Sequence, residues 1–228
     1  MNHRWLVLDL CAPLMAFGGV AVDQVGPTRD FPAASMLTGL LANALGWHWS
    51  DREAHEGLQR RLVFGAAALR EGRLLTDTQN AQLAKNDSGW TTRGRPEGRD
   101  GASYYAPHRR LRSYLADAYI AVVLRLEPAE VAPDLNAIAA ALARPARPLF
   151  IGRKPCLPSA PILRGEVTAE RVFDALIAAG AGGCAATWPA EEGPQPGDKV
   201  ERIDDLPDLR NWHSGVHAGS RRVVIGRL

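Results

Sequence analysis

Arginine side chains are the groups in this chain that could do chemistry, and the largest set lies in a polar stretch at residues 76–113. Guanidinium groups neutralise phosphates and stack on bases, and Trp90, Tyr104 and Tyr105 offer flat surfaces to unpaired bases. Acidic residues dilute the charge, so composition alone also allows a plain solvated loop. The dense run His108–Arg112 favours nucleic-acid binding. The basic residues of the stretch are Lys85, Arg93, Arg95, Arg99, Arg109, Arg110 and Arg112.

A second basic group surrounds a proline-rich turn. Prolines lie between its basic residues and directly after them. Because the proline ring restricts φ, such a turn holds its charges in place. We therefore expect a fixed basic surface here. Its members are Arg144, Arg147, Arg153 and Lys154.

Catalytic signatures are missing from the sequence. It contains no Walker loop, no G-x-G-x-x-G after a strand, no G-x-S-x-G and no H-E-x-x-H. His213 and His217 could share a helix face as metal ligands, but the Ser and Gly residues around them favour a loop, and no third ligand is evident. The acidic pairs Glu191–Glu192 and Asp204–Asp205 lie in a polar tail, where solvated surface is expected. The sequence therefore predicts a binding protein with no cofactor and no metal.

Composition points to a soluble globular protein of the cytoplasm. The chain has 228 residues, of which 46% are hydrophobic, and a net charge of +2. This length allows one sizeable core, or one domain with a small appendage. Cys11, Cys156 and Cys184 have no C-x-x-C spacing, which fits a reducing compartment. The uncharged stretch Phe31–Ser50 contains proline, asparagine and histidine, so we expect a buried helix rather than a membrane span.

The elements that must position the arginines alternate between strands and helices. Trp5–Cys11 predicts a buried strand, and a helix capped by Ser35 and ended by Gly46 follows. Further along, the pattern predicts strands at Leu62–Leu69, Asp117–Leu126, Leu149–Ile151 and Val223–Ile225, and helices at Leu135–Leu142 and Val167–Ala179.

This order predicts an α+β fold with a ferredoxin-like sheet-and-helix core. We expect the core at residues 1–75 and 114–180. An inserted hairpin would occupy residues 76–113, because structureless insertions of this length are uncommon unless they are functional or disordered. Residues 181–228 would form a small irregular, polar extension with one final strand.

Four ordered blocks of the sequence resemble the CasD family of the type I-E CRISPR Cascade. Residues 12–18, A-P-L-M-A-F-G, resemble the family's G-P-M-Q-A-W-G element. Residues 26–46 resemble R-P-T-x-x-F-P-x-x-S-x-L-x-G-L-L-x-x-x-L-G. Residues 112–118 resemble R-x-Y-L-x-D-A, and residues 147–156 resemble P-x-x-x-L-G-R-x-x-C-P. The blocks depart from the pattern at Phe17, where the family has Trp, and at Ala12, where it has Gly; the tail is only loosely similar.

The resemblance implies a non-catalytic RNA-binding role. Proteins of this family have an RRM-like (RAMP) core with a long β-hairpin thumb, cap one end of Cascade and hold the 5′ handle of the CRISPR RNA. The thumb, here residues 76–113, would lie beside the guide–target duplex. The implied partners are the guide CRISPR RNA, a CasC-type backbone subunit and a CasA-type large subunit. Target DNA would be met indirectly, through the complex.

The resemblance also directs attention to particular residues. Arg29 and the Ser35 region would lie near phosphates, which helix N-termini attract. The remaining expected RNA contacts are Trp90, Arg93, Arg95, Arg109, Arg110, Arg112, Arg147, Arg153 and Lys154. One alternative is a metal-independent endoribonuclease that processes precursor CRISPR RNA. Its base and cation would come from Tyr104 or Tyr105, His108 and Lys154.

Overall fold

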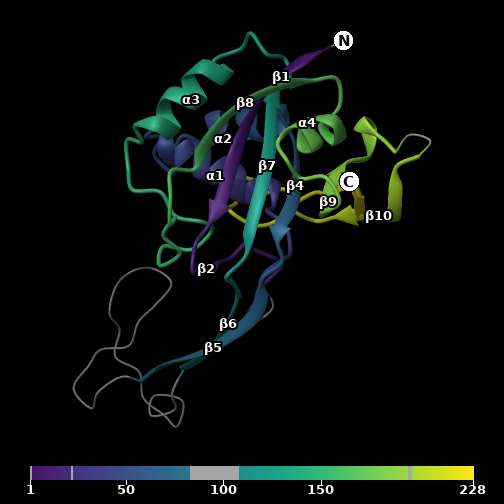
Figure 1. Ribbon diagram of the computed structural model, residues 1–228. Helices are drawn as coiled ribbons and strands as arrows, with labels where there is room; N and C mark the ends of the chain where they lie inside the picture. Colours follow the sequence, from purple (N-terminus) through teal and green to yellow (C-terminus); the bar gives the residue numbers. More distant parts are fainter. Residues whose placement is uncertain (1, 22, 83–107, 195–196) are drawn as a thin grey trace.

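The computed structural model describes residues 2–21, 23–82, 108–194 and 197–228 (Figure 1). Its central element is a sheet of seven strands in the order β10-β11-β9-β4-β7-β1-β8. Neighbouring strands in this order are antiparallel. The fold is therefore α+β, as predicted. The strands are β1 His3–Cys11, β4 Leu62–Arg70, β7 Tyr119–Leu126, β8 Leu163–Ala169, β9 Ala185–Pro189, β10 Lys199–Leu206 and β11 Arg221–Arg227.

Side-chain alternation along the central strands divides the core into two layers. Leu6, Leu8 and Leu10 of β1 belong to one cluster of buried residues, whereas Trp5 and Val7 belong to the other. Successive side chains of a strand point to opposite faces of the sheet. A strand that is apolar on both faces must therefore be covered on both sides.

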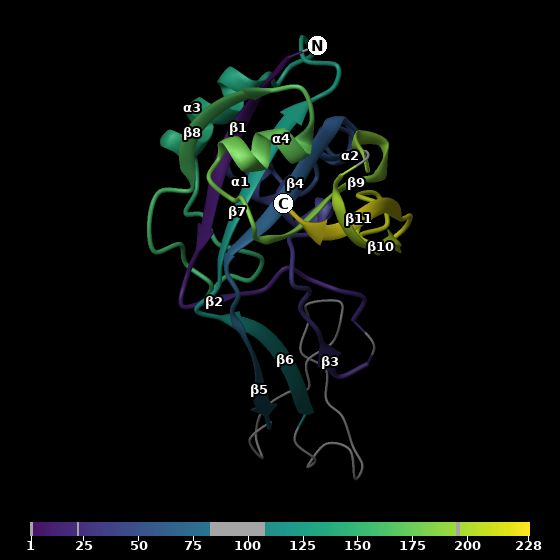
Figure 2. The ribbon, with the colours of Figure 1, turned by 45° about the vertical axis from the view of Figure 1, so that its right-hand side comes forward.

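Helices supply that cover. α1 Ala34–Ala44, α2 Arg52–Arg61 and α3 Leu135–Ala143 pack on the first cluster. The short helix α4 Val172–Ala178 packs on the second, and Figure 2 shows it in front of the sheet with α1 behind. A 3₁₀ turn, η2, follows β9 at Ala190–Glu192. Among the described helices, none is long and apolar enough to cross a membrane.

A second, smaller sheet projects from one end of the first. It contains β2 Leu14–Met15, β3 Val25–Gly26, β5 Arg73–Ala81 and β6 His108–Ala116. β5 pairs with β6 along its whole length, from Arg73 opposite Ala116 to Ala81 opposite His108. This β5–β6 ribbon points away from the main sheet in Figures 1 and 2. β5 begins at Arg73 and β6 ends at Ala116, so the ribbon starts closer to the core than the predicted insertion, residues 76–113.

The sequence patterns located most of the N-terminal elements. The strands expected at Trp5–Cys11, Leu62–Leu69 and Asp117–Leu126 correspond to β1, β4 and β7. The strand expected at Leu149–Ile151 is wrong, because this segment lies in a turn in which the backbone N–H of Ile151 donates to the carbonyl of Cys156 at 2.7 Å. The helix α2 was not expected.

The C-terminal third differs most from the prediction. Residues 181–228 are not an appendage, because β9 lies between β4 and β11 inside the main sheet and buries Trp188. The expected boundary at residue 180 therefore falls within one continuous sheet. The helix expected at Val167–Ala179 is wrong in its first half, since Val167, Thr168 and Ala169 pair with β1 as part of β8. Only the final strand, at Val223–Ile225, was placed correctly, within β11.

Candidate nucleic-acid interface

Three sequence blocks that lie far apart in the chain meet the C-terminal segment around one pocket. Its walls come from the loop at 16–18, one side of α1, the turn at 150–153 and the loop at 210–217, and they enclose about 340 Å³. We call this space the convergence pocket. Apolar side chains and glycines form most of the lining, and arginine and histidine side chains add positive or polar groups. The lining residues are Ala16, Phe17, Gly18, Ser35, Met36, Gly39, Leu40, Phe150, Gly152, Arg153, Arg210, Trp212 and His217.

Gly152 brings two walls of the pocket into backbone contact. A Cβ atom at this position would lie 1.5 Å from the carbonyl oxygen of Ala16, and the φ angle of Gly152 is +84°. The N–H of Ala16 in turn donates to the carbonyl of Ile151 at 3.2 Å. Only glycine combines this conformation with this approach. The turn at 150–153 is therefore fixed against the loop at 16–18.

Arg153 ties two further segments, β3 and β6, to this turn. Its Nη1 donates to the carbonyl of Ser113 at 2.9 Å, and its Nη2 donates to that of Gly26 at 2.8 Å. The guanidinium carbon lies 4.8 Å from the centre of the Tyr114 ring. The Arg112 side chain meets the same spot, since a Cβ atom on Gly26 would lie 2.5 Å from its Nη1. The pocket wall therefore carries a positive charge whose position is set by backbone carbonyls.

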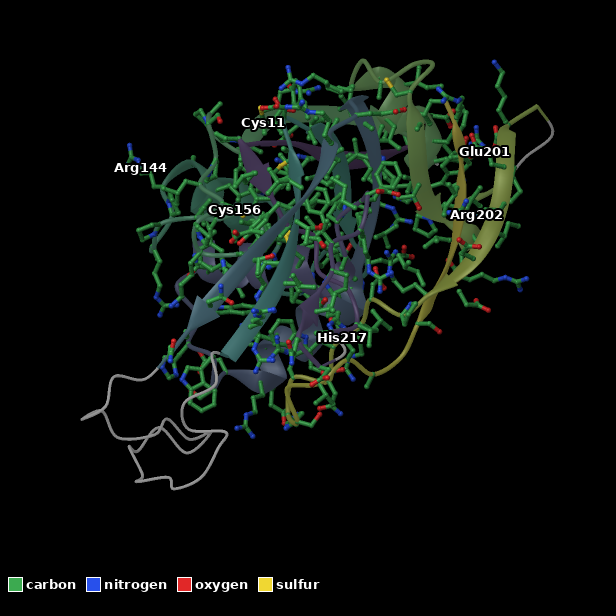
Figure 3. All side chains as sticks on the ribbon, turned by 90° about the horizontal axis from the view of Figure 1, so that it is seen from below. Cys11, Arg144, Cys156, Glu201, Arg202 and His217 are labelled. Atoms are coloured by element: carbon green, nitrogen blue, oxygen red, sulfur yellow. The ribbon has the colours of Figure 1, made fainter. Side chains whose placement is uncertain are left out.

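A tight turn holds Arg153 in this orientation. The N–H of Cys156 donates to the carbonyl of Arg153 at 2.8 Å. The Cys156 thiol is buried beneath the turn, and burial raises its pKa, although the nearby Arg153 acts in the opposite direction. The thiol is thus held in its neutral form and packs within the hydrophobic core. Figure 3 shows Cys156 inside the molecule and Arg144 at its outer edge.

The N-terminus of α1 is capped by a residue from the far end of the chain. The N–H of Ala34 donates to Oδ2 of Asp208 at 2.9 Å, and the N–H of Ser35 donates to the Asp208 carbonyl at 3.1 Å. The N-cap residue is Ala33, so the expected cap by Ser35 is wrong. The helix begins two residues earlier because Asp208 supplies the acceptors. Ser35 instead lines the convergence pocket.

Comparison with known proteins identifies the family. The model of the family described as CRISPR-associated protein (Cas_Cas5) matches residues 5–224. The chain belongs to this Cas5 family. It is also 27% identical over 175 residues to the CRISPR system Cascade subunit CasD of Escherichia coli (strain K12), a match that covers 77% of this chain and 76% of the relative. The resemblance to CasD seen in the sequence is therefore confirmed.

Solved structures share the fold of this Cas5-family chain. A chain of a CRISPR RNA-guided surveillance complex superposes with a TM-score of 0.68 and 21% identity, covering 98% of this chain and 90% of the other. A structure described as a Cas protein superposes with a TM-score of 0.60 and 23% identity, covering 98% and 95%. At these identities the superpositions establish the fold alone.

The ribbon of this Cas5-family chain carries the expected arginine run. Arg109 and Arg110 are exposed on β6, and Arg112 is half-buried closer to the core. Because neighbouring residues of a strand face opposite sides, Arg110 and Arg112 share one face and Arg109 lies on the other. Nη1 of Arg110 donates to the carbonyl of Asp23 at 3.2 Å, which links the ribbon to the segment that leads into β3.

The other expected contacts are dispersed. Arg29 donates from Nη2 to the carbonyl of Pro207 at 2.8 Å and lines a neighbouring groove rather than the convergence pocket. Arg147 donates from Nη2 to the carbonyl of Gly46 at 2.9 Å, at the C-terminus of α1. Lys154 is exposed. Trp90, Arg93 and Arg95 lie outside the described residues, as do Tyr104 and Tyr105 of the alternative nuclease site, and the side chain of His108 is not described.

Sequence reasoning missed the C-terminal wall of the pocket. Gln59 of α2 donates from Nε2 to the carbonyl of Arg210 at 2.9 Å and accepts from the Arg210 N–H at 3.1 Å. Trp212 packs against His55, with ring centroids 4.6 Å apart and ring planes tilted by 32°. His217 lines the pocket, and in the described part of the chain no group of three or more His, Cys, Asp or Glu residues could hold a metal ion. Trp212, an aromatic residue in an otherwise polar tail, is the one local signal of this wall.

Proposed function

We propose that this chain is the non-catalytic CRISPR RNA-binding subunit of a Cascade-type surveillance complex, where it holds the 5′ handle of the guide. The convergence of the CasD-like blocks on one pocket carries the proposal. The partly exposed Phe150 in its lining suits stacking with an unpaired base, and the half-buried Arg153 suits an attached phosphate. A single-stranded end of the guide offers that combination, whereas a duplex does not expose its bases.

The fold supports the proposal through its topology. The strands β4-β7-β1-β8 lie in the order of a split β-α-β unit, with α1 and α2 between β1 and β4, and α3 between β7 and β8. We assign this part to the ferredoxin-like, RRM-like core of a RAMP protein. Such a core presents RNA-binding loops on a rigid sheet, which suits a subunit that positions a guide.

The β5–β6 ribbon is proposed as the base of a thumb that lies beside the guide–target duplex. Arg109 and Arg110 are exposed along it, so phosphates of the guide or of the duplex can approach them. Because the net charge of the chain is only +2, this local concentration would supply most of the electrostatic attraction. Sequence recognition would belong to base pairing by the guide.

The proposed setting is the cytoplasm, within an assembly. The partners would be the guide CRISPR RNA, a CasC-type backbone subunit and a CasA-type large subunit, with target DNA reached through the guide. The proposed role needs no cofactor.

A combined binding and cleavage assay tests this function. The purified chain is titrated against a labelled precursor RNA that contains the repeat, over a salt series and with EDTA present. We expect intact RNA and an affinity that falls as salt rises, because phosphate contacts release counterions. Discrete cutting within the repeat, lost on His108→Ala, would contradict the proposal and make the chain the processing nuclease. Absence of RNA binding, both alone and in the assembled complex, would also overturn it.

A further inference from the structure

The segment Pro207–Ser220, here called the C-terminal loop, forms one wall of the convergence pocket although it is remote in sequence from the other walls. It contributes Arg210, Trp212 and His217 to the lining. Asp208, which leads into these residues, contacts Ala34 across a separation of 174 residues. The shape of the pocket therefore depends on how this loop is attached to the helices.

Asp208 is the innermost attachment. Its side chain is fully buried, and it accepts hydrogen bonds both from the first amide of α1 and from Nη2 of Arg221, the latter at 2.7 Å. The partial positive charge of the helix N-terminus and the guanidinium both stabilise a carboxylate here. The Asp208 carboxylate thus occupies the anion-binding position at the N-terminus of α1. The adjoining pocket must therefore bind its ligand through other groups.

The outer part of the loop is attached to α2. The Gln59 side chain donates to the carbonyl of Arg210 and accepts from its N–H, which is the pattern of a hydrogen-bonded residue pair between two strands. Trp212 packs on His55, and the Arg210 guanidinium carbon lies 5.1 Å from the centre of the Trp212 ring. The loop thus presents a guanidinium stacked on an indole at the pocket edge, a surface that suits the flat face of a base.

We propose that the C-terminal loop determines which unpaired base the convergence pocket accepts, and that Asp208 is the positioning residue that sets this wall. The proposal rests on the RNA-binding function proposed above and adds the origin of base preference. A volume of about 340 Å³ is near the lower end of the range for small-molecule pockets, roughly 300 to 1,000 Å³. One base fits such a space, where its face would meet the Arg210–Trp212 pair and its edges would meet Ser35 and His217.

The test compares Asp208 with Asp134, a half-buried aspartate whose side chain also caps a helix N-terminus. Asp134 accepts from the N–H of Ala137 at 2.8 Å at the start of α3 and does not line the convergence pocket. The variants are Asp208→Ala, Asp208→Asn and the control Asp134→Ala. Asn still accepts from Ala34 but no longer pairs with the Arg221 charge. Melting temperature is measured for each variant, and affinity is measured with short single-stranded RNAs that contain only adenine, only cytosine or only uracil.

We expect wild-type protein to prefer one of these RNAs. Asp208→Ala should weaken binding to the preferred RNA by about tenfold and reduce the preference, because freeing the wall removes interactions on the scale of one buried hydrogen bond. The salt dependence should stay unchanged, since the phosphate contacts remain. Asp208→Asn should show an affinity and a preference between those of the wild type and Asp208→Ala. Asp134→Ala should lower the melting temperature without changing the preference.

Several results would overturn the proposal. Equal affinity of the wild type for all three RNAs would show that the pocket does not select a base, while leaving the RNA-binding function standing. An unchanged preference in the Asp208 variants, or an equal loss in Asp134→Ala, would remove Asp208 from a positioning role. If Asp208→Ala does not fold, the exposed Arg210→Ala and His217→Ala variants test the wall directly, and preference unaffected by both would contradict it. Failure of wild-type protein to bind any RNA would instead count against the proposed function.

Discussion

The convergence pocket and the β5–β6 ribbon use arginine in opposite ways. In the pocket wall, Arg153 is half-buried and donates to the carbonyls of Ser113 and Gly26, so its first task is to join backbone segments. On the ribbon, Arg109 and Arg110 are exposed. A two-stranded ribbon has little stability of its own, and β2 and β3 pair only with residues 111–112 and 115–116 of β6, towards its core end.

This difference separates two tasks that an arginine count cannot distinguish. Fixed charges on a well-packed wall select the shape of a ligand, because moving them breaks backbone hydrogen bonds. Exposed charges on a projecting ribbon attract any phosphate and are screened by salt. Substitutions in the pocket wall should therefore change stability and RNA preference together, whereas substitutions on the ribbon should change salt dependence alone.

The largest expected effect follows from adding a side chain to the pocket wall at Gly152. Gly152→Val should destabilise the protein by roughly 4 kcal/mol or prevent folding, because its Cβ would overlap the Ala16 carbonyl. Denaturant unfolding followed by circular dichroism measures the change. Gly182→Ala is the control, since an added Cβ there meets no described atom within 4 Å and should change little. A Gly152→Val protein with wild-type stability would contradict the tight packing of the wall.

Removing the guanidinium of Arg153 should have the next largest effect. Arg153→Met should lower the free energy of unfolding by about 2 kcal/mol, because the carbonyls of Ser113 and Gly26 lose their partner. RNA affinity should fall in the same variant. Arg144→Met is the matched control, because Arg144 is exposed at the periphery (Figure 3) and should affect neither property. Equal losses of stability and RNA affinity in Arg153→Met and Arg144→Met would contradict the distinction between wall and surface arginines.

The ribbon arginines should affect salt dependence without affecting stability. Arg109→Gln combined with Arg110→Gln should leave the free energy of unfolding within about 0.5 kcal/mol of wild type. The slope of log affinity against log salt should become shallower by about 1.4, since each lost single-strand phosphate contact contributes about 0.7. Arg222→Gln, an exposed change on β11, is expected to keep the wild-type slope. A double variant that also keeps the wild-type slope would show that the ribbon does not meet phosphates.

The smallest effect concerns the buried thiol beneath the wall. Because burial raises the pKa of Cys156, the thiol of the unfolded chain ionises at a lower pH than that of the folded chain. Its contribution is therefore fully present below the unfolded pKa, near 8.5, and is lost as pH rises through the higher folded value. Unfolding of wild type and Cys156→Ala under reducing conditions at rising pH should reveal a shallower decline in the variant. Parallel pH profiles would contradict this assignment.

Local patterns in the sequence were enough to place the central strands and α1. β1 and β7 are buried on both faces, so continuous apolar runs identify them, and α1 has leucines at helical spacing with Gly46 after it. β9 was missed because its short run is flanked by glycine and proline, and only its place between β4 and β11 makes it a core strand. Burial of Trp188 is decided by those neighbours.

The sequence identified separate blocks of the site, but it did not predict which residues come together in the pocket. The blocks containing Phe17, Ser35 and Arg153 were identified, and the structure brings them to one pocket. The Asp208 cap could not be predicted, because its partner Ala34 is 174 residues away and no local periodicity encodes the contact. The same distance hid Trp212, whose position follows from packing on His55.

Photo-crosslinking of guide RNA that carries 4-thiouridine in its repeat-derived 5′ end would show which surface of the protein holds the handle. The complex is assembled with this RNA and irradiated, and the crosslinked peptides are identified by mass spectrometry. We predict crosslinks in peptides that contain Phe17, Phe150 or Trp212, with further crosslinks along β6. Crosslinks confined to α4 and β8, away from the convergence pocket and the ribbon, would contradict binding of the handle at the pocket.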